Sequence, residues 1–315
     1  MPNVVLKAES LSKSYNGLAA VKNLSLGVEE GEVFGFLGPN GAGKTTTINM
    51  LCGLLRPDAG QVYLHGKAIS GGDPRLKALV GVCPQQIVLW ERLTCLEQLV
   101  FIGQMYSLPQ RTARQNSLRL LAELDLEEKR NSLARTLSGG MQRRLNIAMA
   151  LVHDPQIIVL DEPEAGLDPQ SRVKVREYIQ SLARHKTVIL TTHNMDEADR
   201  VADRVAIIDH GELLVLDTPE KLKRSVGEGD VLEIHLNNDS TDTAAASATL
   251  GELASEVKLD PAAHLLRVRS LNAVGHLATI LERLGGAGFM PGEVSLHANT
   301  LEDVFIQLTG RGLRQ

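Results

Sequence analysis

A glycine-rich stretch between an apolar run and a helical pattern constrains the fold of this chain more than any other feature. It follows the pattern G-x-x-x-x-G-K-[ST] and consists of Gly38, Pro39, Asn40, Gly41, Ala42, Gly43, Lys44 and Thr45. Residues 33–37 before it predict a short apolar strand, and residues 46–54 after it carry apolar side chains at helical spacing. Glycines let the backbone approach an anion, and the N–H groups at a helix start point toward it. The stretch therefore predicts a phosphate-binding loop.

The side chains of this loop fit a nucleoside triphosphate. Lys44 would reach the β- and γ-phosphates, the Thr45 hydroxyl would bind Mg²⁺, and Thr46 would belong to the same nucleotide-binding set. The alternative is a glycine-rich turn that only starts a helix. Because the strand, the lysine and the threonine occur together, the pattern favours the phosphate site.

A pair of acidic residues supplies the metal ligand that such a loop needs. Asp161 and Glu162 follow residues 157–160, an all-apolar run typical of a strand buried on both faces of a parallel sheet. Ligands bind at the carboxyl ends of such strands, so Asp161 would hold Mg²⁺. Glu162 would polarise a water for in-line attack on the γ-phosphate. An Asp-Glu pair alone is usually a solvated strand end, but the phosphate loop in the same chain favours the catalytic interpretation.

A second glycine-rich helix start occurs at Ser138, Gly139 and Gly140. Ser138 is placed to cap the helix, and the two glycines expose the backbone amides at its start, which favours an anion. Considered alone, the pattern would be explained by helix capping. One nucleotide needs only one cradle of this kind, so the second one predicts contact with a nucleotide held by another copy of the protein.

Length and charge limit the classes of function. The chain has 315 residues, which favours one large domain with an appendage, and its formal net charge of −5 gives no reason to expect a nucleic acid. Cys52, Cys83 and Cys95 suggest neither a zinc ribbon nor a disulfide framework. We find no signal segment and no run that reaches the ~18 apolar residues of a membrane span. We expect a cytoplasmic protein that acts at a membrane only through another polypeptide.

The order of patterns along the chain predicts an α/β fold. Short β-leaning runs before residue 65 predict a small antiparallel sheet, and residues 75–152 read as helical. Strands and helices then alternate up to residue 216, which predicts a mainly parallel, doubly wound sheet. After a hinge at residues 227–230, the pattern changes to that of a small α+β domain. We predict two domains, residues 1–226 and 227–315, with a helical subdomain at about residues 86–152.

These motifs, in this order, resemble the ATP-binding subunits of ABC transporters over residues 4 to about 220. The resemblance rests on residues 38–45, Gln85, residues 137–142, Asp161, Glu162, residues 166–168 and His193. It implies that the first domain is an ABC-type ATP-binding domain, with a P-loop NTPase core, an antiparallel β subdomain and a helical subdomain. It also implies that the chain binds ATP and Mg²⁺ and hydrolyses ATP.

The resemblance implies roles for residues within one chain. Tyr15 would stack on adenine, although an ordinary core or strand aromatic is the alternative. Gln85 would contact Mg²⁺ or the attacking water and link the site to the helical subdomain. His193 would sense the γ-phosphate and help to hold Glu162 or the water, although a lone histidine is usually structural.

Other implied roles require a second copy, and we expect a homodimer. Ser138 and Gly140 would contact the γ-phosphate of the nucleotide in the facing subunit, and Asp168 would span the dimer interface. One position departs from the family, because Glu164 stands where threonine is usual. Its carboxylate would either slow closure of the dimer by charge repulsion or face solvent.

The C-terminal residues indicate the direction of transport. Residues 301–310 look like the tail of ATPases that serve drug, polysaccharide or lipid exporters. We therefore expect an ATP-driven clamp, peripheral on the inner face of the cell membrane, that powers export through separately encoded permease subunits. The permease would dock near the apolar cluster of Leu89, Trp90 and Leu93, unless Trp90 packs within its own subdomain. The second domain would serve in regulation or dimerisation.

Two other classes of function fit less well. An ABC-type ATPase acting on nucleic acid or ribosomes would carry a long coiled-coil insertion or two linked cassettes, and the sequence has neither. A regulatory protein with an inactive nucleotide site conflicts with the presence of Lys44, Asp161 and Glu162.

Overall fold

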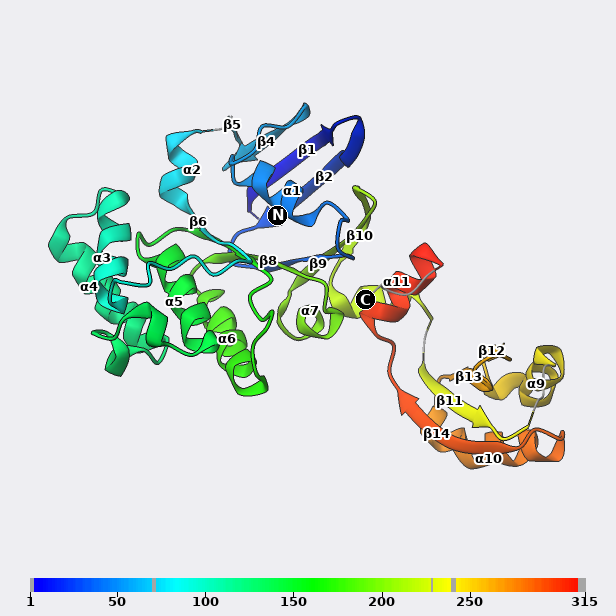
Figure 1. The fold of residues 1–315 in the computed structure, drawn as a ribbon. Coiled ribbons are helices and arrows are strands. Elements are labelled where there is room, and N and C mark those ends of the chain that lie inside the picture. The colour runs from blue at the N-terminus through cyan, green and yellow to red at the C-terminus, as the bar shows by residue number, and fades with distance from the viewer. Residues whose placement is uncertain (1–2, 70–71, 228, 239–241, 311–315) are drawn as a thin grey trace. The chain divides into compact units, whose positions relative to one another are not determined.

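The computed structural model describes residues 3–69, 72–227, 229–238 and 242–310. The chain divides into two compact units, of which unit 1 extends to Pro219 and unit 2 begins at Glu220 (Figure 1). The predicted domain boundary between residues 226 and 227 falls just inside unit 2 and stays a prediction. Within the predicted hinge, residue 228 lies outside the described residues.

A six-stranded sheet forms the centre of unit 1. Its order is β10-β9-β3-β8-β7-β6, and the strands are parallel except for β10, which pairs antiparallel with β9. The strands are β3 (Val33–Leu37), β6 (Val80–Cys83), β7 (Ile157–Asp161), β8 (Thr187–Thr192), β9 (Arg204–Asp209) and β10 (Glu212–Asp217). Every residue of β3, β7 and β8 is buried, as expected for a parallel sheet covered on both faces.

One face of this sheet packs against α1 (Lys44–Leu51) and an antiparallel sheet of order β2-β1-β4-β5 (Figure 1). The strands of that sheet are β1 (Val4–Tyr15), β2 (Leu18–Glu29), β4 (Ala59–Leu64) and β5 (Lys67–Ile69). Phe34 and Phe36 of β3 point into this core, whereas Val33 of the same strand belongs to the core on the opposite face. The alternation follows from the two-residue period of a strand.

The opposite face is covered by helices of the middle of the chain. The helices of unit 1 after α1 are α2 (Pro74–Leu79), α3 (Cys95–Met105), α4 (Gln110–Glu123), η1 (Glu127–Lys129), η2 (Ala134–Thr136), α5 (Gly139–Leu151), α6 (Pro169–Leu182) and α7 (Met195–Val201). Of these, α2 packs on the first face, because its Leu76 belongs to the same core as Phe34. Thr94 and Glu97 form a capping box at the start of α3. The prediction that the region after residue 75 is helical throughout is wrong, because β6 joins the edge of the parallel sheet beside β7.

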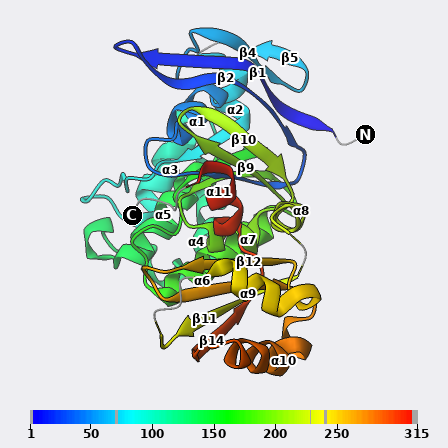
Figure 2. The same ribbon diagram turned by 90° about the vertical axis from the view of Figure 1, so that its right-hand side faces the viewer.

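Unit 2 is an α+β fold with a four-stranded antiparallel sheet. Its elements are α8 (Pro219–Ser225), β11 (Asp230–Leu236), α9 (Thr243–Leu250), η3 (Gly251–Leu253), β12 (Glu256–Asp260), β13 (Leu265–Ser270), α10 (Ala273–Gly286), β14 (Pro291–His297) and α11 (Leu301–Thr309). The strand order β12-β13-β11-β14 with this element order is the ferredoxin-like arrangement. In Figure 2, α10 runs beside β11 and β14, and apolar residues of the sheet, such as Leu232 and Val268, pack into the same core as Ile280 of α10.

The predicted fold class, an α/β core with an antiparallel subdomain, a helical subdomain and a small C-terminal α+β domain, is confirmed. The sequence missed α9 and β12, because the Ala/Ser/Thr-rich stretch before β12 has no clear apolar period. The last helix is capped by Thr300, whereas Asn299 bonds to Arg269 instead. Within the part of the chain that the structure describes, none of the helices has the length and apolar character needed to cross a membrane.

Candidate active site

Four neighbouring parallel strands bring most of the predicted site residues to one edge of the sheet. The strands β3, β8, β7 and β6 lie side by side in this order, so their carboxyl ends meet at the same edge. The phosphate loop follows β3, His193 follows β8, Asp161 ends β7, and Gln85 comes two residues after β6. Ligands of such sheets bind at this edge.

Two glycines of the loop lie where the backbone has no room for a side chain. Gly38 has a φ of 154°, and a Cβ there would lie 2.1 Å from the carbonyl oxygen of Ile208. Gly43 has a φ of 102°, and a Cβ there would lie 2.4 Å from the carbonyl oxygen of Ala20. Only glycine fits both positions without moving the loop. The loop is therefore held close to the ends of the neighbouring strands.

Lys44 places a cation inside the phosphate loop. Its side chain is buried, and Nζ donates hydrogen bonds to the carbonyl oxygens of Gly38 (2.6 Å) and Pro39 (3.1 Å). Burial lowers the pKa of Lys44 below its usual value, while the negative charges of Glu162 and Asp161 act in the opposite direction. The ammonium group thus lies among the backbone groups that would surround a phosphate.

Asp161 and Thr45 form an oxygen pair suited to Mg²⁺. The Thr45 hydroxyl donates to Oδ2 of Asp161 over 3.4 Å, and the Thr191 hydroxyl donates to Oδ1. Mg²⁺ prefers oxygen ligands and is usually held by one or two carboxylates together with substrate phosphates. Among the described residues, no group of three or more His, Cys, Asp or Glu side chains is placed to hold a metal ion. Thr45 and Asp161 therefore fit a metal shared with a nucleotide.

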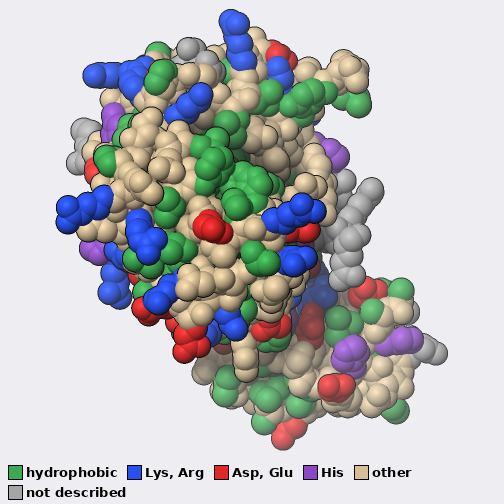
Figure 3. Space-filling view, turned by 60° about the vertical axis from the view of Figure 1, so that its left-hand side comes forward, with side chains coloured by type: hydrophobic (Ala, Val, Ile, Leu, Met, Phe, Trp, Pro, Cys, Tyr) green, Lys and Arg blue, Asp and Glu red, His purple; other side chains and the backbone are tan. Residues whose placement is uncertain are grey.

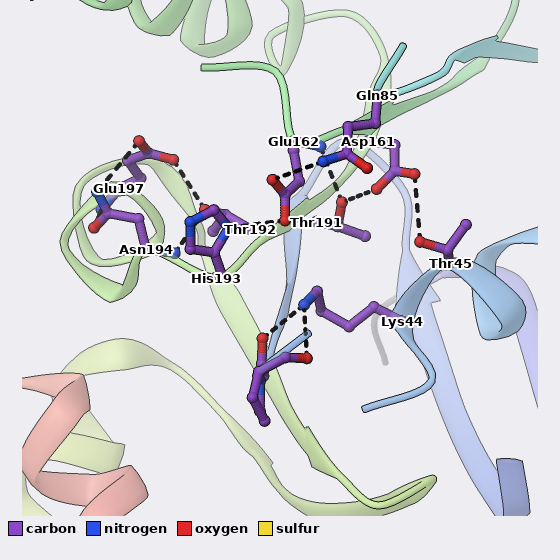
Figure 4. A network of polar contacts seen from close by, with 12 residues as sticks. Lys44, Thr45, Gln85, Asp161, Glu162, Thr191, Thr192, His193, Asn194 and Glu197 are labelled. Atoms are coloured by element: carbon purple, nitrogen blue, oxygen red, sulfur yellow. Dashed lines mark hydrogen bonds and ion pairs between the residues drawn. The ribbon is translucent and has the colours of Figure 1, made fainter. Parts of the chain in front are cut away.

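Glu162 is held by the two side chains predicted to act with it (Figure 4). Its Oε1 lies 2.8 Å from Nδ1 of His193, and its Oε2 accepts a hydrogen bond from Nε2 of Gln85 at 3.3 Å. The Glu162 side chain is 8% exposed, whereas that of His193 is 53% exposed. The imidazole thus contacts the buried carboxylate while it remains accessible to a ligand at the strand ends.

The backbone of Glu162 is in an unusual conformation. Its φ is 46°, in the left-handed region that non-glycine residues seldom adopt. The Glu162 N–H donates to both the carbonyl oxygen (3.1 Å) and the hydroxyl oxygen (3.0 Å) of Thr191. Since the same hydroxyl donates to Asp161, Thr191 connects the two acidic residues. Sequence reasoning missed Thr191 because it read only as the end of an apolar strand.

Ser138, Gly140 and Asp168 form a second group whose hydrogen bonds are local. Ser138 caps α5 by accepting from the N–H of Met141 at 3.4 Å. Asp168 caps α6 by accepting from the N–H (3.0 Å) and the hydroxyl (2.7 Å) of Ser171, which hold the pKa of Asp168 below its usual value. A Cβ at Gly140 would lie 2.3 Å from the Ser171 hydroxyl, so the starts of α5 and α6 pack against each other. Ser138 and Asp168 are both exposed.

The remaining predicted residues lie apart from both groups. Tyr15 ends β1 with 47% of its surface exposed, and Nζ of Lys13 lies 5.9 Å from the centre of its ring. The ring is therefore not a core aromatic, and its adenine contact stays a prediction. The prediction that Glu164 might face solvent is wrong. Its carboxylate is 2% exposed and accepts from Nε (3.3 Å) and Nη2 (3.0 Å) of Arg176, which reduces the charge available to repel a second copy.

Comparison with known proteins shows the family of the chain. Residues 21–165 match the protein family described as ABC transporter. The chain is 40% identical over 313 residues to the Nod factor export ATP-binding protein I of Ralstonia nicotianae, covering 98% of this chain and 95% of that protein. It is 35% identical over 321 residues to the linearmycin resistance ATP-binding protein of Bacillus subtilis, covering 98% of this chain and 100% of that protein.

Solved structures of ATP-binding cassettes share the fold. A dimeric cassette in a post-hydrolysis state, bound to ADP and Pi, is 29% identical with a TM-score of 0.62, covering 68% of this chain and 98% of its own. A nucleotide-free cassette from an ABC transporter is 25% identical with a TM-score of 0.65, covering 70% of this chain and 94% of its own.

Proposed function

The chain belongs to the ATP-binding subunits of ABC transporters, and on that premise we propose that it hydrolyses Mg²⁺-ATP at a site completed by a second copy of the protein. This hydrolysis would power export through a separate membrane permease. The observation that carries this proposal is the division of the site into two groups. One is the network around Glu162, and the other is the exposed surface at Ser138.

Within one chain, Glu162 is the proposed general base. Its two carboxylate oxygens contact His193 and Gln85, so its orientation toward a water at the strand ends is fixed. Phosphoryl transfer depends mainly on such positioning and on stabilisation of charge. Thr45, Asp161 and Gln85 would hold Mg²⁺, and the bound ion would supply positive charge next to the phosphates. Lys44 would add a second positive charge at the β- and γ-phosphates.

The second copy would supply the start of α5. Helix N-termini bind phosphate groups through free N–H groups and the helix dipole. Ser138 lies exposed at this start, and Asp168 lies exposed at the adjoining start of α6. We place the γ-phosphate of the other copy's ATP against Ser138 and Gly140, so that two copies enclose two ATP molecules. The dimeric state of a solved cassette with ADP and Pi supports this arrangement.

A shallow groove on the helical subdomain is the proposed permease contact. It is lined by Trp90, Glu91, Arg92, Leu93 and Phe101. The Trp90 and Phe101 rings pack edge to face at 5.3 Å, yet 39% and 45% of their surfaces stay exposed. Figure 3 shows hydrophobic side chains gathered among basic and acidic ones on the face of unit 1 that is turned forward. Such a patch is typical of a protein contact, which would hold this subunit peripherally at the membrane.

Export as the direction of transport rests on two features. Residues 301–310 resemble the tail of export ATPases, and they form α11 with its capping box of Thr300 and Asp303. Similar proteins are named for Nod factor export and for linearmycin resistance.

The variant Glu162→Gln tests the proposed reaction. It keeps the shape of the side chain but removes the base, so kcat for ATP should fall by about 100- to 1000-fold while ATP binding and Tm stay close to wild type. Phosphate release and calorimetric titration would measure this, with the exposed Glu128→Gln as a control. Turnover by Glu162→Gln at the wild-type rate would contradict the assignment.

Trp90→Ala tests the permease contact. The variant should hydrolyse ATP normally but be recovered less with its membrane partner after detergent solubilisation, because it removes a large exposed apolar ring from the groove. Leu18→Ala is the control, since Leu18 is 77% exposed and lies outside the groove. If the wild type and Trp90→Ala were recovered with the membrane partner in equal amounts, the groove would not be the docking site.

A further inference from the structure

Two consecutive arginines on α5 have different environments, although the sequence does not distinguish them. Arg143 is 1% exposed and Arg144 is 7% exposed. Arg144 donates from Nη1 to the carbonyl oxygen of Leu124 at 2.6 Å and lies 3.7 Å from the Asp125 carboxylate, so it binds the turn after α4. Arg143 points instead toward the candidate active site. Neither residue was among the predicted site residues.

All five N–H groups of the Arg143 guanidinium have a carbonyl acceptor. Nε donates to Pro163 at 3.1 Å. Nη1 donates to Pro84 (2.8 Å) and Gln85 (3.0 Å), and Nη2 donates to Asp161 (2.6 Å) and Glu162 (2.8 Å). A guanidinium carries one hydrogen on Nε and two on each Nη, so the acceptors match the donors in number. No other side chain could make this set of contacts, because lysine has only three donors on one nitrogen.

These contacts join three segments that the reaction needs together. Arg143 lies on the helix that begins at Gly139, the residue after Ser138. Its acceptors include the carbonyl oxygen of Gln85 and those of the three consecutive residues 161–163. Asn146, three residues further along α5, strengthens the link, because it donates to Sγ of Cys83 at 3.2 Å and accepts from the N–H of Val88 at 3.4 Å.

The contact from Arg143 to the Glu162 carbonyl oxygen also explains how the left-handed backbone conformation of Glu162 is maintained. A left-handed residue other than glycine persists only where its surroundings hold it. The Glu162 N–H is bound by Thr191, and its carbonyl oxygen is bound by Arg143, so the peptide groups on both sides of Glu162 are fixed. The direction of its side chain toward Gln85 and His193 follows from that backbone conformation.

We propose that Arg143 is a positioning residue for ATP hydrolysis, which ties the backbones of Gln85 and of residues 161–163 to α5. The base and Gln85 would then keep a fixed geometry relative to the helix start at Ser138 that contacts the partner's nucleotide. The inference rests on the proposed function, since it assumes that Glu162 is the base and that Ser138 belongs to a shared site. Arg143 itself touches no reacting atom and acts through Glu162 and Gln85.

The first test compares Arg143→Lys with Arg144→Lys in the full-length chain. Lysine keeps the charge at both positions but cannot hold the carbonyl groups around Arg143 at once. We expect Arg143→Lys to lower kcat for ATP by about 10- to 100-fold, since small errors in position have effects of this size, and to leave KM within about twofold. Arg144→Lys should keep kcat within about twofold of wild type, although both variants lower Tm. A kcat near the wild-type value in Arg143→Lys, or an equal loss in both variants, would overturn the inference.

A double-mutant cycle separates positioning from a general structural role. If Arg143 acts through Glu162, adding Arg143→Lys to Glu162→Gln should cause little further loss in single-turnover hydrolysis. If Arg143→Lys lowered the single-turnover rate as much in the Glu162→Gln variant as in the wild type, the inference would be overturned. Arg143→Gln serves as a second variant, and failure of both Arg143 variants to fold would assign the residue to the fold alone and likewise overturn it. The proposed function would be contradicted by a different result, the absence of ATP hydrolysis by the wild-type protein.

Discussion

The starts of α1 and α5 could each bind a phosphate group, but the side chains around them differ. The start of α1 has no side-chain cap among the described residues, and Lys44, its first residue, extends its side chain back to the carbonyl oxygen of Gly38 in the loop before it. The start of α5 is capped by Ser138, and its first two residues are Gly139 and Gly140. The first is surrounded by Asp161, Glu162 and the residues that hold them, whereas the second is exposed. This difference supports the proposal that α1 binds a nucleotide within its own chain and that α5 completes a site on another copy.

The largest expected effect is at α1. Lys44→Ala removes the cation of the loop, so the affinity for ATP should fall by about 10- to 100-fold, the range expected for a lost charged hydrogen bond of about 1.5–3 kcal/mol. Hydrolysis should become undetectable. Isothermal titration of the isolated chain would measure the affinity, with Lys174→Ala on the surface of α6 as a control. Unchanged affinity would show that α1 is not the in-chain site.

A substitution at α5 should separate hydrolysis from binding. Ser138→Arg places a bulky side chain on the proposed dimer surface, so hydrolysis should fall by at least about tenfold while ATP binds the single chain with near wild-type affinity. Gln110→Arg on α4 is the matched control for an added exposed arginine. Loss of binding in the isolated Ser138→Arg chain would mean that both helix starts serve one nucleotide.

A smaller effect is expected from Thr191, which supports only the α1 half of the site. Thr191→Val leaves Oδ1 of Asp161 without its hydroxyl donor and the Glu162 N–H without one of its two acceptors. We expect kcat to fall by about tenfold with little change in KM, and Thr191→Ser to restore the rate because it keeps the hydroxyl. Steady-state kinetics of the two variants would measure this. Equal rates for Thr191→Val and wild type would show that the hydroxyl does not position the acidic pair.

The sequence alone was sufficient to locate the residues that follow strands. The phosphate loop and Asp161 each come directly after an apolar run, and parallel strands bring such positions to one edge. The role of His193 was implied by the family resemblance. Gln85 was found through the family resemblance, because β6 was hidden in a region that reads as helical. The fold class could be predicted for the same reason, since strand and helix patterns alternate clearly in the core.

Side chains that act through backbone groups could not be predicted in this way. Arg143 and Arg144 are adjacent and identical in the sequence, and only the packing of α5 decides which one faces the acidic pair. The ion pair of Glu164 with Arg176 joins residues on different segments, so an exposed carboxylate was equally compatible with the sequence. In unit 2, α9 and β12 were missed because neither has a strong period of apolar residues.

A cross-link between chains tests most directly whether α5 completes the site of another copy. One chain would carry Asn40→Cys in the phosphate loop and a differently sized tagged chain would carry Ser138→Cys, both with Glu162→Gln so that ATP is retained. Both positions are exposed, while Cys52, Cys83 and Cys95 are buried and should not react. The account predicts a disulfide-linked species containing both chains that forms with ATP and not without nucleotide. Absence of that species with ATP, or its equal formation without nucleotide, would contradict a site shared between two copies.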